Sequence, residues 1–190
     1  NITIAVGERV LAENLSFIAN DGELTCITGA AASGKTTLLR TLMGFLPVKS
    51  GFVSVDGELL TIYSSHVFRE MMVYLPQDVQ TLGLQLEEPE ATQVEADDYA
   101  VWYEVLPSVE IAQPRAPLTT DEILLLTTNT LEESADKPIV IADEPTALLS
   151  SEQGYQLMQL LLQQAEQGKT VVIASSDPMV LDRANQIIKI

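Results

Sequence analysis

Eight consecutive residues, Gly29-Ala-Ala-Ala-Ser33-Gly34-Lys35-Thr36, match the pattern G-x-x-x-x-G-K-[ST] and sharply restrict the possible folds. They follow the apolar segment Leu24–Thr28, which is expected to be a strand, and they open a segment with helical apolar spacing, 38–45. Between a strand and a helix, successive backbone N–H groups of such a loop point at phosphate oxygens. The pattern therefore predicts a phosphate-binding loop; the alternative is a Gly/Ala-rich turn that carries a surface lysine.

The side chains of this loop indicate what it binds. Lys35 brings a positive charge to the β- and γ-phosphates, and the Thr36 hydroxyl can bind Mg²⁺. The residues predicted to contact the nucleotide are Gly29, Ala30, Ala31, Ala32, Ser33, Gly34, Lys35, Thr36 and Thr37.

Two carboxylates follow a second apolar run. Ile139–Ala142 is short and entirely apolar, as expected of a strand buried on both faces, and it is followed by Asp143 and Glu144. Beside a phosphate-binding loop, Asp143 is expected to hold Mg²⁺ through water, and Glu144 to polarise the attacking water as general base. An acidic residue after a strand indicates little alone, but it supports the loop assignment.

The order of predicted elements indicates an α/β fold. Strands alternate with helices at both ends of the chain, which predicts a parallel sheet with flanking helices in a P-loop core. Two hairpins near the start predict an antiparallel β portion at the N-terminal end. We expect one domain over residues 1–190, with its core at 1–77 and 137–190 and a small acidic, partly helical insertion at about 78–136.

The charge balance excludes some partners. The 190 residues include 27 acidic and 10 basic side chains, a formal net charge of −17. Nucleic-acid-binding domains carry a basic surface, so we expect no nucleic-acid partner, nor direct attraction to anionic lipid. Thirteen of the acidic residues lie between Gln85 and Asp136 with one basic residue, Arg115, which fits a solvated surface segment.

Targeting signals and disulfides are not apparent in the sequence. No apolar run approaches the length of a membrane-spanning helix, and the first residues do not resemble a signal peptide. A single cysteine, Cys26, cannot form a disulfide within the chain, which makes the cytosol the default expectation.

Taken together, these motifs resemble the ATP-binding cassette (ABC) ATPases, the nucleotide-binding subunits of ABC transporters. The resemblance rests on the phosphate-binding loop, on Asp143-Glu144-Pro145-Thr146, and on Tyr74-Leu75-Pro76-Gln77-Asp78, which matches the Q-loop of the family. The tail from Gly168 to Ile188 is similar to subunits of the lipoprotein-release and macrolide-export type. The resemblance implies ATP and Mg²⁺ as cofactors, catalytic roles for Glu144 and Gln77, and Thr36, Gln77 and Asp143 as metal ligands.

Several family motifs are altered. The family's Leu-Ser-Gly-Gly-Gln signature corresponds to Leu118-Thr119-Thr120-Asp121-Glu122, which lacks both glycines and places a carboxylate where a partner's γ-phosphate should bind. The switch histidine corresponds to Ser176, the aspartate of the D-loop to Ser150, and the aromatic residue that stacks on adenine to about Val6. We interpret the signature as degenerate.

The resemblance implies a cytosolic ATP-binding subunit, peripheral on the inner face of the cell membrane and bound to a transmembrane permease. A second ABC ATPase subunit would complete a dimer, and the altered signature favours a heterodimer. The alternatives are a nucleotide-binding regulatory or scaffold protein that scarcely hydrolyses ATP, and a P-loop small-molecule kinase. A kinase needs an arginine-rich lid, and the insertion offers only Arg115. The transported substrate and the direction of transport are not indicated.

Overall fold

A five-stranded parallel sheet forms the centre of the computed structural model, which describes residues 1–79 and 117–190. The strand order is β6-β7-β8-β3-β9, and every neighbouring pair is parallel. The strands of this sheet are β3 (Leu24–Thr28), β6 (Met72–Leu75), β7 (Ile139–Asp143), β8 (Thr170–Ala174) and β9 (Gln186–Lys189). Because β3, β7 and β8 are adjacent and parallel, the segments that leave their carboxyl ends meet at one edge of the sheet.

Two small antiparallel pairs lie outside this sheet. Strand β1 (Ile2–Val6) pairs with β2 (Arg9–Leu15), and β4 (Ser54–Val55) pairs with β5 (Glu58–Leu59) across a turn in which Asp56 and Gly57 have positive φ. These pairs confirm the antiparallel β portion predicted from the early hairpins.

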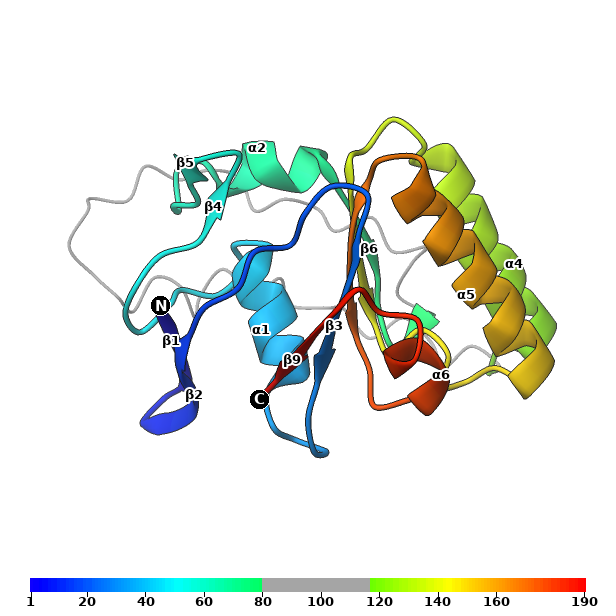
Figure 1. Ribbon diagram of the computed structural model, residues 1–190, viewed down its shortest axis with the longest axis horizontal. Helices are drawn as coiled ribbons and strands as arrows, with labels where there is room; N and C mark the ends of the chain where they lie inside the picture. Colours follow the sequence, from blue (N-terminus) through cyan, green and yellow to red (C-terminus); the bar gives the residue numbers. More distant parts are fainter. Residues whose placement is uncertain (80–116) are drawn as a thin grey trace.

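Helices cover both faces of the sheet (Figure 1). Helices α1 (Lys35–Leu42) and α2 (Ser65–Glu70) pack with β1 on one face, around buried Leu38, Leu39 and Phe68. The other face is covered by α4 (Thr120–Glu133), α5 (Ser151–Glu166) and the short α6 (Pro178–Leu181).

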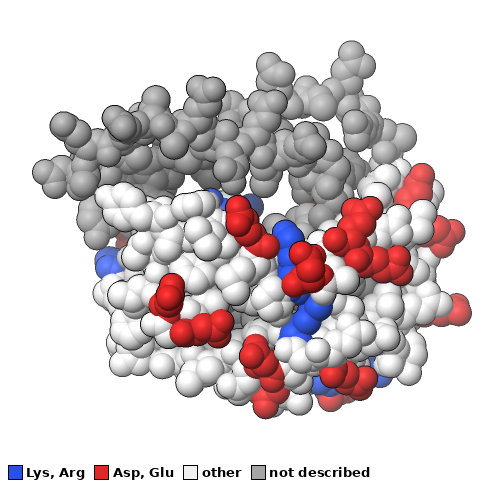
Figure 2. All heavy atoms as spheres, turned by 90° about the horizontal axis from the view of Figure 1, so that it is seen from above, with Lys and Arg blue, Asp and Glu red and all other residues white. Residues whose placement is uncertain are grey.

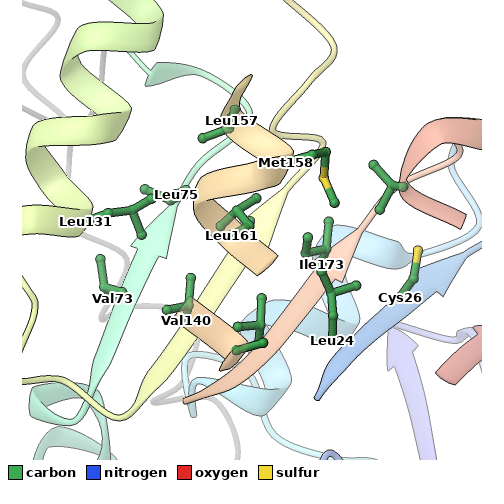
Figure 3. Packing of buried hydrophobic residues seen from close by; sticks show 14 residues of the cluster. Leu24, Cys26, Val73, Leu75, Leu131, Val140, Leu157, Met158, Leu161 and Ile173 are labelled. Atoms are coloured by element: carbon green, nitrogen blue, oxygen red, sulfur yellow. The ribbon is translucent and has the colours of Figure 1, made fainter. Parts of the chain in front are cut away.

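The second face contains the larger buried cluster. Leu157, Met158 and Leu161 of α5 are fully buried and point at side chains of the sheet, among them Val140 and Ile173 (Figure 3). The residues of α5 that face the sheet recur at the spacing of one helical face, so its amphipathic pattern is the reason it packs here. Packing of α5 against the sheet holds β3, β7 and β8 in place, and predicted site residues lie at or just after the ends of β3 and β7.

Part of the predicted insertion is an ordered element of this core. Leu131 of α4 is 4% exposed and packs in the same cluster, and α4 lies beside α5. Residues 80–116, including the predicted helical stretch Tyr99–Leu106 and Trp102, lie outside the described residues. The boundaries of the insertion at about 78–136 stay a prediction.

Charged side chains are dispersed on the face shown in Figure 2. Carboxylates are scattered over this face, and the Lys and Arg side chains visible there lie among them without forming a basic patch. This distribution agrees with the net charge of −17. Among the described residues, no helix is both long enough and apolar enough to span a membrane.

Candidate nucleotide-binding site

The loop between β3 and α1 requires glycine at both glycine positions of its motif, Gly29 and Gly34. Gly34 has φ of 107°, and a Cβ there would lie 2.9 Å from Cδ1 of Leu11 on β2. A Cβ on Gly29 would collide with the carbonyl oxygen of Ile190 and lie 2.6 Å from Oγ of Ser33. At Gly34 both the positive φ and the lack of space select glycine, and at Gly29 the lack of space does.

The start of α1 provides backbone donors at this loop. The helix begins at Lys35, its N-cap Gly34 supplies no side-chain cap, and Leu38 N donates the first helical hydrogen bond to Gly34 O at 2.8 Å. The N–H groups of the first turn have no acceptor within a helix, and the helix dipole adds partial positive charge there. These donors suit an anionic ligand such as phosphate.

Lys35 lies folded over the loop. Its Nζ donates to Gly29 O at 3.1 Å and forms an ion pair with Oε1 of Glu144 at 3.3 Å. The two paired side chains are only 10% and 20% exposed. Lys35, the only cationic side chain of the predicted phosphate-binding loop, is thus paired with Glu144, the predicted general base.

Thr36 and Asp143 also meet. Thr36 Oγ1 donates to Asp143 Oδ2 at 2.7 Å, and Asp143 is 2% exposed. Burial raises the pKa of Asp143 above its usual range, against the hydrogen bond from Thr36, which lowers it. The other carboxylate oxygen, Oδ1, is buried and has no hydrogen-bond partner among the described residues.

This pair of oxygen donors fits Mg²⁺. Mg²⁺ is usually held by one or two carboxylates together with waters and substrate phosphates, so a hydroxyl and one buried carboxylate are enough when a nucleotide is present. In the described part of the chain, no group of three or more His, Cys, Asp or Glu forms a metal cluster. A Mg²⁺ ion held by Thr36 and Asp143 would take its remaining ligands from phosphate and water.

Glu144 is held in a strained position. Its φ is 45°, a left-handed conformation that is costly for a residue with a side chain. Its backbone N donates to Ala174 O at 2.8 Å, and its Oε2 accepts from Ser175 Oγ at 3.0 Å and from Ser176 N at 3.4 Å. The end of β8 thus fixes both the backbone and the carboxylate.

A sequence model described as "ABC transporter" matches residues 12–147, more than half of the chain. The chain belongs to the ABC transporter family. This assignment covers the phosphate-binding loop and the segment that ends in Thr146.

Curated ABC relatives match along nearly the whole chain. An ATP-dependent lipid A-core flippase of Burkholderia thailandensis is 30% identical over 95% of this chain and 32% of the flippase. A putative ABC transporter ATP-binding protein of Treponema denticola is 30% identical over 93% of this chain and 37% of that protein. The chain spans about a third of the length of these relatives.

Solved ABC structures share the fold. A nucleotide-free ATP-binding cassette from an ABC transporter gives a TM-score of 0.71 at 19% identity and covers all of this chain and 85% of its own. A dimeric ATP-binding cassette bound to ADP and Pi gives 0.67 at 21% identity and covers all of this chain and 90% of its own. At these identities the likeness shows the fold of the ABC cassettes.

Gln77, the Q-loop residue, lies two residues beyond the end of β6 and is exposed. Because β6 pairs in parallel with β7, with Leu75 opposite Ala142, Gln77 leaves the sheet at the same edge as Asp143. The topology therefore places Gln77 at the sheet edge that carries Asp143, and its role as a metal ligand and catalytic residue stays a prediction.

The segment 118–122, which we interpret from its sequence as an altered ABC signature, forms the capped start of α4. The Thr119 hydroxyl accepts from Glu122 N at 3.3 Å, and Glu122 Oε2 accepts from Thr119 N at 2.8 Å, which is a capping box. Asp121 Oδ1 accepts from Gln153 Nε2 of α5 at 2.6 Å. The Thr119 hydroxyl and the carboxylates of Asp121 and Glu122 therefore all form hydrogen bonds within the chain.

Ser150, which the resemblance places at the aspartate of the ABC D-loop, caps α5 in the same way. It forms a capping box with Gln153, which also binds Asp121. Ser176, which the resemblance places at the switch histidine, donates from Oγ to Gly29 O at 3.2 Å. Both serines therefore have local partners in place of the roles that the family motifs imply.

No sequence pattern predicted Ser175, although it contacts the predicted site. The available signal was its place directly after the buried strand Thr170–Ala174, the same arrangement that drew attention to Asp143 after Ile139–Ala142. A serine after a strand is too common to single out, and only the structure shows that its hydroxyl reaches Glu144.

Proposed function

We propose that this chain is the ATP-binding unit of an ABC transport system and binds Mg·ATP at residues 29–37. The observation that supports this most directly is the meeting of Lys35, Thr36, Asp143 and Glu144 at the carboxyl ends of β3, β7 and β8. These four groups come from the end of β7 and from the segments that follow β3 and β7, and each is suited to triphosphate, metal or water. They converge beside a helix N-terminus.

Each group has a role in this proposal. The first-turn N–H groups of α1 and the Lys35 ammonium bind the phosphate oxygens, and Ala30–Ser33 line the loop. Thr36, Asp143 and Gln77 hold Mg²⁺, which neutralises charge on the β- and γ-phosphates when bound. Glu144 orients a water toward the γ-phosphate and takes up its proton.

The partners follow from the family. Relatives include a flippase and, among solved structures, an ABC exporter with ATP bound, and one similar cassette is a dimer. By analogy, we propose that this unit works with a second ABC ATPase unit and a transmembrane permease, on the cytoplasmic face of the membrane. Asp121 at the altered signature favours a heterodimer whose partner supplies an intact signature.

A second candidate is a regulatory or scaffold unit that binds ATP without appreciable hydrolysis. The specific observations are that Thr119 and Asp121 are engaged within the chain, and that Ser176 binds the loop where the family has its histidine. The carboxylate of Glu144 is the opposing observation. Single-turnover hydrolysis, with and without a cassette bearing an intact signature, separates the two candidates.

Thermal unfolding tests nucleotide binding. Mg·ATP should raise the melting temperature of the wild-type chain, because a ligand that binds only the folded state stabilises it by mass action. Lys35→Ala should abolish the rise, and Lys49→Ala, which removes an exposed cation away from the loop, should keep it. An undiminished rise in Lys35→Ala would overturn the assignment of the phosphate-binding loop.

A further inference from the structure

Ser175 lies fully buried at the end of β8 and connects two segments of the site. Its N donates to Ile27 O of β3 at 2.9 Å, so the residue is fixed to the sheet. Its hydroxyl donates to Glu144 Oε2 at 3.0 Å and accepts from Asp177 N at 3.1 Å. Because the hydroxyl accepts one hydrogen bond from Asp177 N, its own hydrogen is free to point at Glu144.

This bond decides which way the Glu144 carboxylate faces. Oε2 is held by Ser175 and by the N–H of Ser176, which leaves Oε1 turned toward Lys35 Nζ at 3.3 Å. Lys35 is bound at the same time to Gly29 O. The lysine that should bind phosphate is therefore paired with a carboxylate that a serine keeps in place.

We propose that Ser175 is a positioning residue that holds Glu144 against Lys35, so that a nucleoside triphosphate must break this ion pair to bind. The inference rests on the proposed function and adds a regulation of the same site. The Lys35–Glu144 ion pair lowers the affinity for phosphate, because only chains in which this pair is broken can bind phosphate through Lys35.

Ser175→Ala tests the inference without changing any charge. ATP affinity is measured in EDTA, so that metal does not act through Asp143 or Glu144. The variant should bind ATP about fivefold more tightly than wild type, the factor that corresponds to loss of a partly exposed ion pair. Its melting temperature should fall, because a buried hydroxyl is lost and Asp177 N loses its acceptor. Simple structural damage would weaken binding, so the opposite sign separates the two explanations.

Ser65→Ala is the matched control, because Ser65 is also buried and donates to a backbone carbonyl, Ile62 O, away from the site. It should lower stability without tightening ATP binding. Ser175→Thr, which keeps the hydroxyl, should bind ATP as wild type does.

A double-mutant cycle with Glu144→Gln locates the effect. Ser175→Ala should tighten binding in the wild-type background and have no effect when Glu144 is already Gln, since no ion pair then remains to release. Unchanged or weaker ATP binding by Ser175→Ala, or an equal effect in both backgrounds, would overturn the inference while leaving the proposed function intact. Failure of the wild-type chain to bind ATP would remove the proposed function, and the inference with it.

Discussion

Cys26 is fully buried on β3, and burial raises the pKa of its thiol to about 11. Since the thiolate is the reactive form, we expect no reaction with a thiol reagent at pH 8 in the folded chain. The same reagent should label the chain fully in denaturant, where the thiol titrates near its ordinary value. As Cys26 is the only cysteine, the labelling rate reports unfolding directly, and rapid labelling of the native chain would contradict this packing.

The position that the resemblance assigns to an aromatic residue stacking on adenine carries an aliphatic side chain. Val6, at the expected stacking position, is about half exposed, and the Phe45 ring lies 4.8 Å from the Arg69 guanidinium. Loss of stacking costs about 1 kcal/mol. We therefore expect weak ATP affinity and poor discrimination against GTP in a competition titration. A strong preference for ATP would show that another ring, such as Tyr63 or Phe45, stacks on the base.

Among the elements, α4 depends on its first turn. Thr119→Ala removes the capping box and should lower the free energy of unfolding by about 1 kcal/mol. Thr130→Ala on the same helix, a half-buried threonine whose hydroxyl donates to Leu126 O, should change it by much less. Equal losses in the two variants, measured by urea denaturation, would show that the cap contributes little.

The same cap should depend on pH. Hydrogen bonds from Thr119 lower the pKa of Glu122, so its stabilising effect is present above the ordinary range of a glutamate and is lost as the pH falls through the lowered value. The difference in stability between wild type and Thr119→Ala should therefore shrink on acidification. A constant difference from neutral to acid pH would contradict the role of the carboxylate.

Sequence predicted the elements better than it predicted the bonds between them. Continuous, largely apolar runs predict β3, β7 and β8, because parallel strands that are covered on both faces must be apolar on both. The phosphate-binding loop was predicted because its glycines and lysine have fixed spacing. Contacts such as Ser175 with Glu144 and Gln153 with Asp121 depend on how separate segments are placed, and no local pattern encodes them.

For the whole molecule, the proposed function implies that the described site forms one side of an ATP site. Lys35, Thr36, Asp143 and Glu144 lie on this chain, and the opposite wall in an ABC dimer comes from a partner's signature. In a homodimer that wall would carry Asp121, whose carboxylate would repel the γ-phosphate. Because each lost preorganised group that stabilises transferring phosphate costs about 10²–10³ in rate, the isolated chain should be nearly inactive as an ATPase.

A partner should restore turnover. Mixing the chain with a cassette that bears an intact signature should raise ATP hydrolysis, and Glu144→Gln in this chain should then remove the gain. A gain that survives Glu144→Gln would place the hydrolysing site on the partner's own loop.

One measurement tests the central claim, that this chain binds Mg·ATP but cannot complete the site for hydrolysis alone. The chain is mixed in excess over radiolabelled Mg·ATP, and bound nucleotide and released phosphate are followed in the same samples. We predict that ATP is bound and stays intact in the isolated chain. Absence of bound ATP, or hydrolysis at roughly the enzyme median of 10 s⁻¹, would contradict the account.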